Sequence, residues 1–143
     1  PNFRVANPAG RLLSLPGARS WLPLVAGETR SFAPRNDRHA RHWTTEYPTV
    51  ALLPMQALID RADGLDWRAA TSPALFWFSP RDTVVDARAT EVVAASWGGA
   101  TDIRRIDPAS GDDPEAHVIA GDILSPARTA ETVAEMIVWL ESL

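Results

Sequence analysis

A short apolar segment between two prolines most constrains how this chain can fold. Leu75–Phe78 are all apolar, and Pro73 and Pro80 bound them. Strands that are buried on both faces of a parallel sheet have unbroken apolar sequences of this kind. A second strand-like segment, Thr101–Ile106, is more mixed in polarity, as is usual near the edge of a sheet. The sequence therefore predicts an α/β fold with these two segments as its last two parallel strands.

A helical pattern follows each predicted strand. Asp86 can cap a first helix, which stops at Gly98-Gly99 and turns inward the residues Ala89, Val92, Val93 and Trp97. Ser125-Pro126 opens a second helix, with Ser125 expected as its N-cap. Its inward face is expected to hold Ala130, Val133, Ile137 and Leu140, and its outward face Glu131 and Glu135. Alternation of strand and helix is typical of the end of a doubly wound sheet.

Two polar residues follow the predicted strands and are the candidate catalytic pair. Asp82 comes just after the first strand, at the carboxyl end where open α/β sheets place their chemistry. His117 follows the second strand after a polar loop, and the apolar residues after it predict a partly buried ring. A carboxylate that orients an imidazole, and an imidazole that takes a proton from serine, are two members of a catalytic triad.

Each of these assignments has a structural alternative. Asp82 follows Pro80 closely, so its carboxylate can instead accept backbone N–H groups in a turn. A histidine in a loop is often only locally hydrogen-bonded. Asp86 competes for the role of the acid, although a helix cap accounts for it.

The third member of a triad, the nucleophile, is not evident. No Gly-x-Ser-x-Gly sequence occurs, although it marks the strained turn that carries the serine in α/β-hydrolases. Of the serines after His117, Ser125 is explained as a cap and Ser142 is next to last. The hypothesis is that the serine and the oxyanion donors lie upstream of Pro1, and that this chain alone is inactive.

Five segments carry a resemblance to a known family: Pro1–Phe3, Arg11–Arg19, His42–Thr49, Ala74–Asp82 and His117–Asp122. Together they resemble the second half of a bacterial α/β-hydrolase of the monoacylglycerol lipase and lysophospholipase type. In that family a cap follows the sixth core strand, the acid follows the seventh and the histidine follows the eighth. The resemblance implies a serine carboxylic ester hydrolase with Asp82 and His117 as acid and base. Its partners would be a small-molecule or lipid ester and the N-terminal half of the same fold.

Residues 1–66 are predicted to be a mainly helical cap, and residues 67–143 the C-terminal part of the core. Asn36 or Asp37 can start a helix that runs through Trp43, and no convincing strand is present. A second helix ends at Gly64, and one face of it holds Leu52, Met55, Leu58 and Ile59. Before Arg35, frequent prolines and glycines predict short helices and turns. The cap either gates the substrate or simply covers the surface.

Composition narrows the function classes. With 143 residues, 45% of them hydrophobic, the chain is large enough for one core. Its net charge of −4 and the lack of an aromatic-interleaved basic stripe disfavour nucleic acid. The absence of cysteine, of a long apolar run and of a signal segment predicts a cytoplasmic location, with export left open.

Weaker alternatives remain beside the esterase hypothesis. His39 and His42 lie three residues apart and could bind a metal, but both are assigned to a solvated cap surface, so no metal and no cofactor is expected. The chain could instead be a non-catalytic binding module that has kept the fold. It could also belong to a haloalkane or epoxide hydrolase that uses an aspartate nucleophile. Self-association through an exposed sheet edge is expected for the chain alone.

Overall fold

The computed structural model describes residues 10–143, so the segment Pro1–Phe3 lies outside the described residues. The chain divides into two compact units between Leu65 and Asp66.

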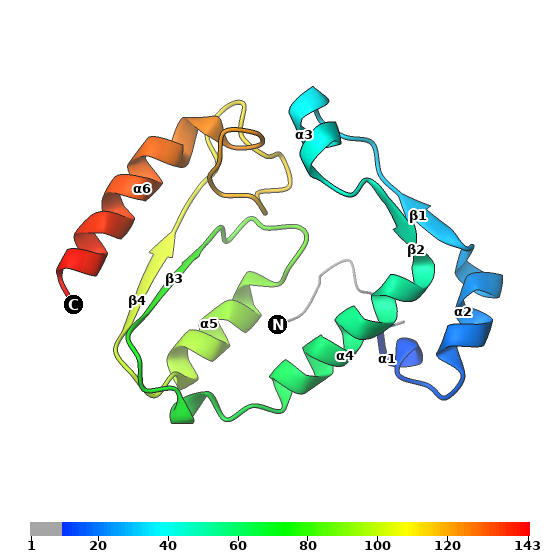
Figure 1. The fold of residues 1–143 in the computed structure, drawn as a ribbon. Coiled ribbons are helices and arrows are strands. Elements are labelled where there is room, and N and C mark those ends of the chain that lie inside the picture. The colour runs from blue at the N-terminus through cyan, green and yellow to red at the C-terminus, as the bar shows by residue number, and fades with distance from the viewer. Residues whose placement is uncertain (1–9) are drawn as a thin grey trace. The chain divides into compact units, whose positions relative to one another are not determined.

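The unit from residue 66 onward contains a parallel pair of strands with a helix after each. β3 (Ala74–Phe78) and β4 (Thr101–Arg105) pair in parallel, with Ala74 opposite Thr101. α5 (Ala87–Ser96) connects the two strands, and α6 (Pro126–Glu141) follows β4. The strand pair lies between α5 and α6 (Figure 1). A mixed α/β class with a parallel strand pair is confirmed.

The predicted burial of β3 is only partly present. Phe78 is buried, but Leu75–Trp77 are half-buried. Within the described residues this sheet consists of β3 and β4 alone, so β3 has one neighbouring strand. A strand needs neighbours on both edges, and helices over both faces, to lose contact with water completely. The prediction of full burial is therefore wrong for this chain as described.

α5 begins as predicted, but one residue of its predicted inward face is exposed. The Asp86 side chain caps it, with Oδ1 accepting from the Arg88 backbone N–H at 3.0 Å. Ala87 and Ala94 are the buried positions, whereas Val92 is 68% exposed. Residues two positions apart in sequence are separated by about 200° around a helix, so Val92 lies nearly opposite Ala94. The inward assignment of Val92 was therefore wrong.

The Gly98-Gly99 turn after α5 allows two backbone segments to pass very close together. A Cβ atom on Gly98 would lie 1.9 Å from the Arg68 carbonyl oxygen. One on Gly99 would lie 2.5 Å from the Ser72 carbonyl oxygen. Beside this turn, Trp97 stacks on Trp67 and donates from Nε1 to the Ser72 carbonyl at 2.8 Å. Only glycine fits this approach.

α6 contacts β4 through its polar face. Trp139 Nε1 donates to Asp102 Oδ2 at 2.9 Å, and Arg104 Nε lies 3.8 Å from Glu135 Oε2. Thr132 is the buried residue of this helix. The predicted orientation was wrong, because all four residues of the predicted inward face are exposed: Ala130, Val133, Ile137 and Leu140. Glu135, predicted to face outward, instead lies beside Arg104 of β4. We call the exposed side the α6 apolar face: Val133, Met136, Ile137 and Leu140.

The unit that ends at Leu65 is helical with one short antiparallel strand pair. Its helices are α1 (Gly10–Leu13), α2 (Ala18–Ala26), α3 (Asp37–His42) and α4 (Leu52–Asp63), with a 3₁₀ turn at Thr49–Ala51. β1 (Thr29–Ser31) pairs with β2 (Glu46–Pro48). The prediction that this part lacks strands was wrong. Both strands have three residues and are mostly exposed, so they carry no apolar alternation that could reveal them.

The helix limits of this unit follow local signals. Asn36, rather than Asp37, caps α3, because its Oδ1 accepts from the His39 backbone N–H at 2.8 Å. The helix ends at His42, one residue earlier than predicted. α4 ends before Gly64 as expected, but Leu58 on its predicted apolar face is 69% exposed. Across residues 10–143, no helix combines the length and apolar character that crossing a membrane requires.

Candidate functional site

Asp82 and His117 are in direct contact beyond the carboxyl ends of β3 and β4. Asp82 Oδ2 lies 2.9 Å from His117 Nδ1. The other carboxylate oxygen, Oδ1, accepts from the backbone N–H groups of Val84 at 2.7 Å and Val85 at 2.9 Å. The predicted contact is therefore present. The alternative interpretation of Asp82 as a turn residue is also correct, because the two oxygens serve different purposes.

The environments of the two side chains differ. Asp82 is 4% exposed, and its three hydrogen bonds offset the cost of burying a carboxylate. The His117 side chain is 42% exposed, so the ring is more open to solvent than the partly buried ring that was predicted. An ionised carboxylate only accepts hydrogen bonds, so this contact assigns the proton to Nδ1. His117 Nε2 is then the basic nitrogen of the neutral ring.

Asp113 organises the loop that carries His117. Its carboxylate is 4% exposed. Oδ2 accepts from the backbone N–H groups of His117 at 3.1 Å and Val118 at 3.0 Å, and Oδ1 accepts from Glu115 at 3.2 Å. Sequence reasoning missed this residue. The signal was available, since Asp followed by Pro114 is a common start of a turn whose carboxylate binds its own backbone.

The loops after β3 and β4 are also joined to each other. Thr83 donates its backbone N–H to the Glu115 carbonyl at 2.9 Å and its hydroxyl to the same oxygen at 3.3 Å. The Ile106 N–H donates to the Phe78 carbonyl at 2.9 Å and extends the strand pairing. The acid and the histidine therefore lie on two loops that hold each other in place.

Ser125 has a structural role that differs from the predicted one. It occupies the N-cap position of α6, but its side chain does not cap the helix. Its Oγ accepts from the Asp113 N–H at 3.1 Å and donates to the Val118 carbonyl. Asp112 supplies the cap instead, with Oδ1 accepting from the Ala127 N–H at 3.2 Å. Ser125 is 1% exposed and its hydroxyl is already engaged, so it is not a candidate nucleophile.

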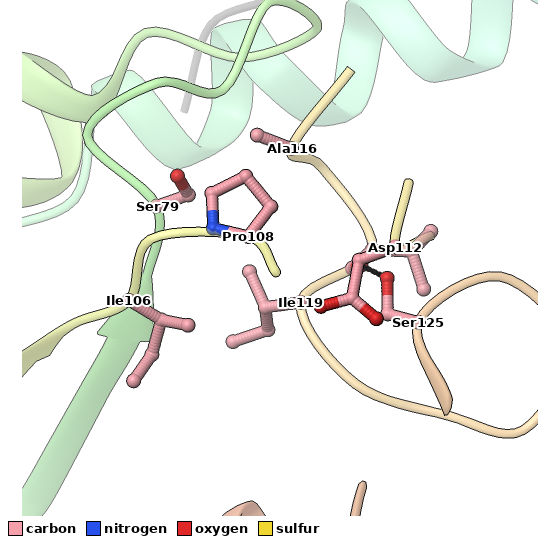
Figure 2. Close-up of a pocket in the computed structure, with 8 residues that line it drawn as sticks. Ser79, Ile106, Pro108, Asp112, Ala116, Ile119 and Ser125 are labelled. Carbon is pink, nitrogen blue, oxygen red and sulfur yellow. Dashed lines mark hydrogen bonds between the residues drawn. The ribbon is translucent and has the colours of Figure 1, made fainter. Parts of the chain in front are cut away.

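A small hollow lies inside these loops (Figure 2). It is lined by Ser79, Ile106, Pro108, Asp112, Ala116, Val118, Ile119 and Ser125. It has no room for a water molecule, and neither Asp82 nor His117 lines it. The hollow is therefore part of the packing beneath the histidine loop rather than a substrate site.

His39 does not occupy the surface position predicted for it. It is 6% exposed, and its Nδ1 accepts from the Arg35 backbone N–H at 3.1 Å. Its ring lies 5.6 Å from that of Phe32 and 5.0 Å from that of Trp43. The His39 ring is buried by packing against these two aromatic rings. His42 is exposed, as predicted. Among residues 10–143 no group of three His, Asp or Glu side chains is arranged to hold a metal ion.

No protein-family model, curated protein or solved structure matches this chain. Function is therefore inferred from the Asp82–His117 pair, the loops that hold it and the sequence resemblance described above.

Proposed function

We propose that this chain is the C-terminal half of an α/β-hydrolase that cleaves carboxylic esters with a serine nucleophile. In this proposal Asp82 is the orienting acid, and His117 is the general base and then the general acid. The single observation that carries it is the 2.9 Å contact between Asp82 Oδ2 and His117 Nδ1 beyond two parallel strands.

The chemistry assigns each atom a task. His117 Nε2 removes the proton from the serine hydroxyl as that oxygen attacks the ester carbonyl. Asp82 keeps the Nδ1 proton in place and stabilises the imidazolium that forms. The imidazolium then gives its proton to the departing alcohol, which leaves an acyl-enzyme. Water, activated by the same nitrogen, hydrolyses this acyl-enzyme and regenerates the serine.

The serine and the oxyanion donors are proposed to come from sequence upstream of Pro1. In the described part of the chain, Ser125, which bonds to the histidine loop, is buried with its hydroxyl engaged. Ser79, just after β3, is also 1% exposed and accepts from the Arg81 N–H. Residues 1–143 alone are therefore expected to be inactive. The substrate is proposed to be a small-molecule or lipid ester, and the helical unit is proposed to be a cap.

The test is ester hydrolysis by the intact protein combined with labelling by a fluorophosphonate. We expect turnover of short-chain aryl esters and one phosphonylated serine, found by mass spectrometry upstream of Pro1. Haloalkane or epoxide turnover without phosphonate labelling would indicate an aspartate nucleophile instead. The absence of both turnover and labelling would favour a non-catalytic binding module.

A further inference from the structure

We infer that Asp113 is a positioning residue that aims the His117 ring at Asp82. This inference rests on the proposed function. Asp113 itself touches the backbone of the loop, not the His117 ring, so it acts through His117.

The hydrogen bonds of Asp113 fix the backbone on both sides of the His117 side chain. Its Oδ2 accepts from His117 and from Val118, the two consecutive N–H groups that flank the His117 Cα atom. The third bond, from Glu115 to Oδ1, fixes the loop just before the histidine. Bonds to an ionised acceptor are about twice as strong as neutral ones, and burial strengthens them further. The direction of the His117 side chain is thereby set by a carboxylate outside the acid–histidine pair.

The backbone beside His117 shows why such an anchor is needed. Ala116 has a φ of 54°, in the left-handed region that residues with a Cβ atom rarely adopt, and it is buried. This conformation is unfavourable for a residue with a Cβ atom and persists where the surroundings enforce it. The N–H groups of Glu115 and His117, the residues on either side of Ala116, both donate to Asp113. The Asp113 carboxylate therefore holds the backbone on both sides of this strained residue.

Substitution of Asp113 by asparagine keeps the size of the side chain but not its hydrogen bonding. The carboxylate uses both oxygens as acceptors, one for two N–H groups and one for a third. An asparagine has one acceptor oxygen, so either orientation of its amide places an NH₂ group against at least one N–H. The loop then has to move away from the residue.

Asp112 provides a matched control. It is adjacent and also buried, and its carboxylate also accepts backbone N–H groups, from Ala109 at 2.8 Å and Ala127 at 3.2 Å. These bonds hold the start of the loop and of α6 rather than the backbone of His117. Asp112→Asn therefore tests loss of a buried carboxylate without loss of the anchor.

The experiment is nitrogen-15 NMR of the histidine rings in the intact protein, together with steady-state ester hydrolysis. His117→Ala assigns the His117 signals. We expect a protonated, carboxylate-bonded Nδ1 in the wild type and in Asp112→Asn. In Asp113→Asn this signature should be lost or broadened, kcat should fall by about 10- to 100-fold, and KM should change by less than about 3-fold.

A second variant covers the case in which Asp113→Asn does not fold. Ser125→Ala removes the hydroxyl that accepts from the Asp113 N–H and donates to the Val118 carbonyl, and should weaken the His117 signature and kcat in the same direction by a smaller factor. If a folded Asp113→Asn matches Asp112→Asn in signature and kcat, or if Ser125→Ala leaves both unchanged, the positioning role is overturned. If the intact protein hydrolyses no ester, the proposed function fails, while the NMR comparison still decides whether Asp113 sets the ring.

Discussion

Asp82 and Asp113 bind different parts of His117: Asp82 contacts the ring, and Asp113 accepts from the backbone N–H. Both acids are buried, and both also accept backbone N–H groups of their own loops. The two carboxylates therefore have separable consequences. Changing Asp82 alters which ring nitrogen carries the proton, and changing Asp113 alters where the ring points.

Asp82→Asn in the intact protein should fold but turn over very slowly. The amide oxygen can replace Oδ1 and accept from Val84 and Val85, so the loop is kept. Its NH₂ group then faces His117 Nδ1, which must accept, and the ring proton moves to Nε2. We expect kcat to fall by about 10⁴-fold, as for the same change in a serine protease, with little change in melting temperature. A loss of less than about tenfold would show that Asp82 is only a turn residue.

Gly98→Ala should strongly destabilise the unit from Asp66 to Leu143. The new Cβ atom would meet the Arg68 carbonyl oxygen at 1.9 Å, and a backbone atom cannot move aside cheaply. We expect a loss of more than about 2 kcal/mol in the free energy of unfolding. Gly64→Ala is the matched control, since its nearest contact would be 3.6 Å and it should cost less than about 1 kcal/mol. Similar denaturant midpoints for the two variants would contradict the close approach at Gly98.

His39→Ala should destabilise the helical unit much more than His42→Ala. The change removes a buried ring between Phe32 and Trp43 and leaves the Arg35 N–H without its Nδ1 acceptor. We expect a cost of about 2 kcal/mol for His39→Ala and less than about 0.5 kcal/mol for the exposed His42. Thermal unfolding, with amide exchange at Arg35, measures this difference. Equal stability of the two variants would contradict the buried position of His39.

The α6 apolar face adds to the exposed sheet edge a second surface through which residues 1–143 produced alone should self-associate. Val133, Ile137 and Leu140 are 51%, 49% and 60% exposed, and a contiguous apolar surface of this kind favours association. Ile137→Glu should lower the average mass seen by light scattering, while Ala95→Glu, which adds the same charge at an exposed position of α5, should not. A monodisperse wild-type monomer at high concentration would rule this out.

The sequence predicted those features that depend on neighbouring residues. Asp86 caps α5, the helix ends just before Gly98-Gly99, and the apolar segment before Pro80 forms β3. The contact between Asp82 and His117 was also predictable, because the carboxyl ends of adjacent parallel strands bring their following loops together.

The features that sequence reasoning missed depend on what each element packs against. α6 turns Glu135 and Trp139 toward β4 because Arg104 and Asp102 offer them partners, and helical periodicity cannot show this. His39 is buried because Phe32 and Trp43 meet around it. Asp113 escaped notice because its partners are backbone N–H groups, whose positions become known only once the loop is folded.

The central claim is that His117 is the base of an ester hydrolase, and turnover of a short-chain aryl ester by His117→Ala in the intact protein tests it most directly. His42→Ala is the control, because that side chain is exposed on the helical unit. We expect His117→Ala to lose essentially all turnover and phosphonate labelling, since the serine loses its base, and His42→Ala to keep nearly all of both. Near-wild-type turnover in His117→Ala would contradict the mechanism, and loss in His42→Ala alone would assign the chemistry to the helical unit.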